Sequence, residues 1–114
     1  MSPIYKLLDQ AAWRAAQAAG TFAGSPVDLA DGFIHFSTAA QAQETAAKHF
    51  RGAADLMLLS VDPERLGAPL VWEPSRGGAL FPHLYAAMPA SAVVAERVLD
   101  LDADGVPMIG ALEP

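Results

Sequence analysis

Two histidines, each inside an apolar stretch, are the residues of this sequence best placed to do chemistry. His35 lies in the segment 31–38 (DGFIHFST) and His83 lies in the segment 81–86 (FPHLYA). Alternate side chains of a strand share a face, so His35 and Ser37 face one way and the apolar residues beside them face the core. An imidazole gives or takes a proton near neutral pH. We therefore expect acid–base chemistry if both histidines enter one cleft; a core histidine bonded to the backbone explains the same letters.

Polar and aromatic side chains elsewhere in the chain are candidate ligand-binding residues. Cations neutralise phosphate, and aromatic rings stack on a planar ligand. A helix that begins directly after the His35 strand also offers free backbone N–H groups to an anion. The loop at 75–78 (SRGG) carries an arginine that is an anion clamp if it folds over a cleft, and an ordinary solvated side chain otherwise. The candidate ligand-binding residues are Lys6, Ser37, Thr38, Trp72, Glu73, Arg76 and Tyr85.

A metal site is the least supported use of these residues. Zinc accepts histidine and carboxylate ligands, so His35, His83 and Glu73 form a conceivable set. No close spacing such as His-x-x-x-His accompanies them. We expect no metal.

Local patterns predict the elements that must position the two histidines. We expect strands at 4–8, 33–38, 55–61, 70–73 and 81–86, helices at 10–19 and from 38 to about 50, and a loop from 21 to 31. Asp9 and Gly20 bound the first helix, and Thr38 with Gln41 has the spacing of a capping box at the start of the second. The near-continuous apolar run at 55–61 predicts the centre of the sheet.

Four further assignments depend on single residues, on a short segment or on a choice between periods. Trp13 is expected in the core, and Pro82 predicts a strand start or an edge strand. The segment 91–101 is rich in valine and is taken as a strand, although its apolar spacing also suits a helix. Residues 62–65 turn the chain and add a helical turn.

Length, charge and composition define the class of protein. The chain has 114 residues, 53% of them hydrophobic, which predicts one domain over 1–114, with a core at about 4–101 and a C-terminal surface segment at 102–114. A net charge of −6 argues against nonspecific binding of nucleic acid. The absence of cysteine suits the cytoplasm, and no stretch resembles a signal peptide or a membrane span of roughly 20 apolar residues.

Four motifs give the chain a family resemblance. IYK at 4–6, DGFIHFST at 31–38, WE at 72–73 and FPHLY at 81–85 look like the uncharacterised family catalogued as domain of unknown function 952, from residue 4 to about 101. The fold of that family resembles the ADP-ribosyltransferases and RNA 2'-phosphotransferases. Those enzymes bind NAD or an ADP-ribosylated intermediate in a cleft of a split antiparallel sheet with flanking helices. The resemblance therefore implies an α+β single domain of this ADP-ribosyltransferase-like kind.

The resemblance also carries over motif by motif. The sequence His35-Phe36-Ser37 is similar to the His-Leu-Ser of the RNA phosphotransferases, whereas Lys6 stands where a histidine is usual. His83 occupies the place, ahead of Pro89, where the transferases have a glutamate that contacts the nicotinamide ribose. The absence of that carboxylate argues against ordinary ADP-ribosyl transfer.

These observations lead to one main hypothesis and two alternatives. In the main one, His35 and His83 flank the reacting centre of a cleft that binds a small-molecule nucleotide, such as NAD or ADP-ribose, with transferase chemistry. A binding module that kept the cleft without the chemistry is the first alternative. The second is a two-histidine phosphoesterase, for which only the His35-x-Ser37 pair has the required hydroxyl. Turnover of a nucleotide by the purified protein would separate an enzyme from a module.

Overall fold

Two three-stranded sheets form the frame of the molecule, and the computed structural model describes residues 2–75 and 78–112. The first sheet has the order β1-β4-β8 and consists of β1 (Ile4–Asp9), β4 (Leu56–Val61) and β8 (Val93–Val98). The second has the order β3-β6-β5 and consists of β3 (Ile34–His35), β6 (Leu80–Leu84) and β5 (Val71–Pro74). A short pair joins β2 (Thr21–Phe22) to β7 (Met88–Pro89). These pairs are all antiparallel, which confirms the predicted α+β domain with a mostly antiparallel sheet.

β4 lies at the centre of the first sheet, as its apolar run predicts. Met57 and Leu59 pack into one hydrophobic cluster, while Leu56 and Leu58 pack into another. Because successive side chains of a strand point to opposite faces, β4 contributes to a core on each side of the sheet. The segment after 92 is indeed a strand, β8, paired with β4.

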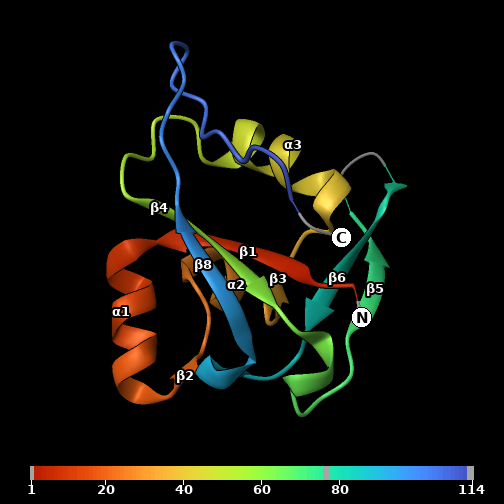
Figure 1. Cartoon of the computed structure of the whole chain (residues 1–114). Helices are drawn as coiled ribbons and strands as arrows, with labels where there is room; N and C mark the ends of the chain where they lie inside the picture. The colour runs from red at the N-terminus through yellow and green to blue at the C-terminus, as the bar shows by residue number, and fades with distance from the viewer. Residues whose placement is uncertain (1, 76–77, 113–114) are drawn as a thin grey trace.

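One helix covers each face of the first sheet (Figure 1). α1 (Gln10–Ala19) begins at Asp9, whose carboxylate accepts the Ala12 N–H at 2.7 Å, and buries Trp13, which is 2% exposed. α3 (Ala39–His49) begins with the predicted capping box and buries Ala42 and Ala46. The expected core position of Trp13 is therefore confirmed.

The expected loop at 21–31 is wrong, because the segment contains β2 and a third helix, α2 (Pro26–Asp31). Ser25 and Asp28 form a capping box, Pro26 occupies the first helical turn, and Gly32 ends the helix at φ 86°. Serine, proline and aspartate favour turns, but at this spacing they also start a helix. The helix is six residues long, too short to show an apolar period.

The expected position of Pro82 in an edge strand or at a strand start is also wrong, because Pro82 is the middle residue of β6 and β6 lies between β3 and β5. The Pro82 carbonyl accepts the Phe36 N–H at 3.1 Å, but proline has no N–H to return the bond. The ladder between β3 and β6 ends there. Ser37 pairs instead with Tyr5 of β1, through N–H to carbonyl bonds of 2.8 and 2.9 Å. The strand that carries His35 thus passes from the second sheet to the first.

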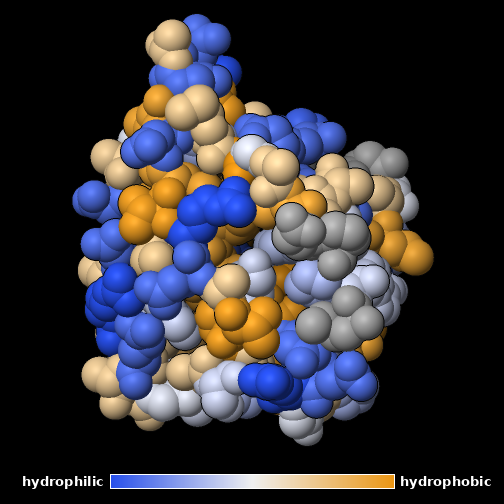
Figure 2. All heavy atoms as spheres, in the orientation of Figure 1, coloured by the Kyte–Doolittle hydropathy of each residue, from blue (hydrophilic) through white to orange (hydrophobic). Residues whose placement is uncertain are grey.

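Short 3₁₀ turns connect the remaining strands, and the chain ends across α3. They are η1 (Pro63–Arg65), which confirms the expected helical turn after β4, and η3 (Ala90–Ala92). Beyond β8 a hairpin projects at the top of Figures 1 and 2, where it carries both hydrophilic and hydrophobic residues. The expected surface segment then buries Pro107 and Ile109, which both bond to the Gln43 amide at 3.0 Å. The hydrophobic core therefore continues past residue 101.

Candidate functional site

His35 and His83 lie directly opposite each other on β3 and β6. Their ring centroids are 5.4 Å apart, and the ring of Phe33 lies 4.6 Å from the first and 4.1 Å from the second. Both histidines line one cavity of about 410 Å³. The prediction that the two side chains share a face and enter one cleft is confirmed.

His83 is held by a carboxylate on one side of its ring. Its Nδ1 lies 2.7 Å from Oε1 of Glu73, and the Tyr85 hydroxyl donates to the same oxygen at 2.7 Å. The hydrogen bond from His83, and then that from Tyr85, lower the pKa of Glu73, and the bond to Glu73 raises the pKa of Tyr85. An ionised carboxylate only accepts, so Nδ1 carries the proton of this bond.

The other ring nitrogen of His83 faces no hydrogen-bond partner within 2–75 or 78–112. The residue is 4% exposed, so water does not surround it. In a neutral imidazole with its proton on Nδ1, Nε2 is an acceptor. The structure thus gives the cavity wall a buried basic nitrogen.

His35 is held from both sides. Its Nδ1 lies 2.6 Å from Oδ1 of Asp28, and its Nε2 lies 2.8 Å from Oδ2 of Asp31. Its backbone N–H also donates to Asp28, at 3.1 Å. Because both ring nitrogens have carboxylate partners, His35 has no nitrogen left for a ligand.

Lys6 has the same kind of internal partners, contrary to the expectation that it neutralises phosphate. Its ammonium lies 2.9 Å from Oδ2 of Asp28 and donates to the carbonyl of His35 at 2.9 Å. Burial lowers the pKa of Lys6, although the Asp28 charge opposes that shift. Burial alone would raise the pKa of Asp28, but the charge of Lys6 and the hydrogen bond from His35 outweigh it and lower that pKa. Lys6 thus connects β1 to α2 through Asp28 and to β3 through the His35 carbonyl.

Asp28 is the residue of this site that sequence reasoning missed. It is 1% exposed and bonds to Lys6, to His35 and to the backbone N–H of Ser25. The sequence feature that could have identified Asp28 is the Ser-Pro-x-Asp spacing at 25–28, which is typical of a helix start but also fits the loop predicted there.

The remaining four predicted ligand-binding residues each have a different position. Ser37 lines the cavity, and its hydroxyl lies 3.0 Å from that of Thr45. Thr38 caps α3, with its own N–H bonded to the side chain of Gln41, and it is not among the residues that line the cavity. Trp72 pairs with Pro82, one position from His83, and therefore faces away from the histidines on the other side of the second sheet. Arg76 lies outside the described residues.

Most of the remaining cavity wall is apolar, with side chains from β1, α2, α3 and β6. The apolar lining residues are Leu7, Val27, Phe36, Phe50 and Phe81. In the ranges 2–75 and 78–112, no group of three or more histidine, cysteine, aspartate or glutamate side chains is arranged to hold a metal ion. Over the same ranges no helix is both long and apolar enough to cross a bilayer.

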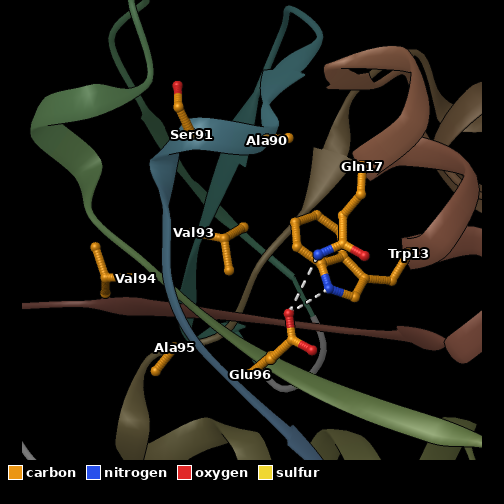
Figure 3. Close-up of a pocket in the computed structure, with 8 residues that line it drawn as sticks. All are labelled: Trp13, Gln17, Ala90, Ser91, Val93, Val94, Ala95 and Glu96. Carbon is orange, nitrogen blue, oxygen red and sulfur yellow. Dashed lines mark hydrogen bonds between the residues drawn. The ribbon is translucent and has the colours of Figure 1, made fainter.

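A second hollow of about 510 Å³ lies beside β8 and is larger than the histidine cavity (Figure 3). Trp13 donates its indole N–H to Glu96 at 2.7 Å, and the Gln17 amide approaches the same carboxylate oxygen at 3.5 Å. The bond from Trp13 lowers the pKa of Glu96. The charged group among the lining residues is thus already bound by its neighbours, so the chemistry favours the histidine cavity despite its smaller volume.

Comparison with known families identifies the chain at this point. The model of the family described as protein of unknown function (DUF952) matches residues 7–96, across both histidine strands. The protein belongs to this family. No curated protein matches the chain.

Solved structures match almost the whole length of the chain. The crystal structure of protein CC0527 from Caulobacter crescentus is 62% identical, covers 96% of each chain and has a TM-score of 0.91. The solution NMR structure of CC0527 is 63% identical, covers 96% of this chain and 95% of that one, and has a TM-score of 0.85. These structures support the fold and name no activity.

Proposed function

We propose that the cavity lined by His35 and His83 binds a small molecule, and that His83 exchanges a proton with it. The observation that carries this proposal is the pair formed by Glu73 and His83, which leaves Nε2 as a buried acceptor in the cavity. A carboxylate behind an imidazole fixes its tautomer and orientation, as in general-base sites. The cavity of about 410 Å³ lies within the range of roughly 300–1,000 Å³ that is usual for ligand pockets.

For the ligand we propose a nucleotide derivative of the NAD or ADP-ribose kind. The support is the resemblance of the two histidine motifs to the RNA 2'-phosphotransferases, together with an antiparallel sheet that is divided beside the cavity. The proposed fold relationship is therefore to the ADP-ribosyltransferase-like proteins. His83 stands at the wall where a ligand hydroxyl would donate to Nε2, and Ser37 lies on the same wall.

The two histidines have different roles in this proposal. His83 is the acid–base group, whereas His35, bound at both nitrogens, shapes the wall and holds α2 in place. A two-histidine phosphoesterase needs two imidazoles that reach the substrate, so the contacts of His35 argue against it. The module that binds without chemistry has the same geometry, and measured turnover distinguishes it from an enzyme.

Thermal unfolding with NAD or ADP-ribose tests the proposal. A ligand at about ten times its Kd stabilises a folded protein by about 1.4 kcal/mol, which raises Tm by about 4–8 °C in a domain of this size. We expect that rise for the wild type and the variant Glu44→Gln, and a much smaller one for His83→Gln. Glu44 is an exposed helix residue paired with Lys48 and does not line the cavity, so this variant shows the effect of a substitution outside the proposed site.

Two results would overturn the proposal. One is the absence of any shift in the wild type at millimolar ligand. The other is an equal shift in His83→Gln, which would place the ligand elsewhere.

A further inference from the structure

Among the described residues, the polar groups that line the histidine cavity include no cation without an internal partner. Lys6 is the lysine of the cavity wall, and its ammonium is already bound by Asp28 and by the His35 carbonyl. His35 faces two carboxylates, and His49, which also lines the wall, has contacts with other residues. A phosphate group needs cations or free N–H donors to replace its water.

Two buried acceptors favour a ligand that donates hydrogen bonds. The first is Nε2 of His83, in a residue that is 4% exposed. The second is the hydroxyl oxygen of Ser37, which is also 4% exposed. Thr45 donates its own hydroxyl to the Gln41 carbonyl at 3.1 Å, so the hydroxyl of Ser37 donates to Thr45 and keeps its lone pairs free to accept. Both acceptors lie in the lining of the cavity and have no further partner in the described ranges.

Three carboxylates lie around the cavity and bind the rings of His35 and His83. Asp28 lies in the wall, while Asp31 and Glu73 bind the outer sides of the two histidines. Among the described residues, the three carboxylates face two cations, Lys6 and a His35 ring whose two nitrogens both donate to carboxylates. An anion in the cavity would therefore meet more negative charge than positive charge from these residues, in surroundings where charges are screened less than in water.

We infer that the part of the ligand that enters this cavity carries no negative charge and donates hydrogen bonds to His83 and Ser37, as the hydroxyl groups of a nucleoside or a free sugar do. This inference rests on the proposed function and specifies its substrate class. In a molecule such as ADP-ribose, an uncharged sugar or base enters the cavity and the diphosphate remains outside. The phosphate pocket that the sequence suggested beside Thr38 is replaced by an acceptor-lined sugar or nucleoside pocket.

Matched pairs of ligands test the inference directly. Binding of adenosine and AMP, and of ribose and ribose 5-phosphate, is measured by titration calorimetry at pH 8, above the usual pKa of histidine. We expect the uncharged member of a pair to bind at least as tightly as the phosphate ester, because the phosphate of the ester, like the diphosphate of ADP-ribose, remains outside the cavity and adds no contact there. Addition of inorganic phosphate should not displace the uncharged ligand. A phosphate concentration of about 10 mM is sufficient, because it is roughly ten times the Kd of a weak ligand near 1 mM.

A hydroxyl deletion adds an internal control. Ser37→Ala removes one acceptor and should weaken binding of the uncharged ligand by about two- to tenfold, the usual effect of one hydrogen bond. Ser91→Ala removes an exposed hydroxyl from the hollow beside β8 and should have no effect.

The outcomes separate this inference from the proposed function. Tighter binding of the phosphate ester, or displacement of adenosine by phosphate, would indicate an anion site. If His83→Gln also abolishes binding of these ligands, the anion site is the histidine cavity, so the proposed function stands and the inference is overturned. If neither pair, NAD nor ADP-ribose binds, both are wrong. An equal effect of Ser37→Ala and Ser91→Ala also overturns the inference.

Discussion

The substitution Asp28→Asn tests whether the ion pair beneath the histidine cavity holds the two sheets together. Asp28 is 1% exposed and accepts hydrogen bonds from Lys6, from the ring Nδ1 and the backbone N–H of His35, and from the backbone N–H of Ser25. Asparagine has nearly the same shape but no charge, and its amide group is a donor where Lys6 and His35 also donate. The change therefore leaves the ammonium of Lys6 buried without a counter-charge.

The expected cost follows from that burial. Lys6 and Asp28 have side-chain exposures of 5% and 1%, so solvent does not compensate for the lost charge. Removing one partner of a buried pair costs about 3–5 kcal/mol, which is a large part of the roughly 5–15 kcal/mol that stabilises a domain. With a urea m-value of about 2 kcal/mol per molar, the midpoint of unfolding should fall by roughly 2 M.

Urea unfolding followed by tryptophan fluorescence is the assay, and Asp31→Asn is the matched control. Asp31 binds the other nitrogen of His35, but its side chain is 47% exposed, so its loss should cost less than about 1 kcal/mol. Equal costs for the two substitutions would refute the account, because they would show that Asp28 is no more important to the fold than a surface carboxylate.

Three further predictions concern the described contacts. The folded-state pKa of Asp28 lies below its usual value of 3.8, so the ionised carboxylate stabilises the fold above pH 4. This contribution is lost as the pH falls through the folded pKa, so the free energy of unfolding should fall less steeply with acid in Asp28→Asn than in the wild type. Trp13→Phe removes the indole donor to Glu96, which should raise the pKa of Glu96 toward its usual value in carbon-detected NMR and cost about 1 kcal/mol; an unchanged pKa would contradict this contact. Gly32→Ala should cost about 1–2 kcal/mol of unfolding free energy in urea, because φ is 86°. No atom lies within 4 Å of the added carbon, so the cost comes from the backbone conformation alone, and a neutral result would contradict the left-handed end of α2.

Features that depend on near neighbours in the chain could be predicted from the sequence. The capping residues Asp9 and Thr38 act on N–H groups two or three positions away, and the apolar run at 55–61 needs only its own pattern to indicate a buried strand. The shared face of His35 and His83 followed from strand alternation within each motif, although their direct pairing is a property of the sheet.

Features that depend on distant partners could not be predicted. The sequence suggests Lys6 as a phosphate ligand because no local pattern connects it to Asp28, which lies 22 positions away. Pro82 suggested an edge, yet β3 accommodates it by leaving β6 and pairing with β1. The roles of Glu73 and Tyr85 follow from a single shared carboxylate oxygen, a contact that no local pattern specifies.

The tautomer of His83 tests the central claim most directly, because the proposed function requires Nε2 to be an acceptor in the cavity. Long-range ¹H–¹⁵N NMR at pH 8 distinguishes a protonated ring nitrogen from an unprotonated one without any ligand. We predict that the proton of His83 resides on Nδ1 in the wild type and that Glu73→Ala removes this preference. A proton on Nε2 in the wild type would contradict the account.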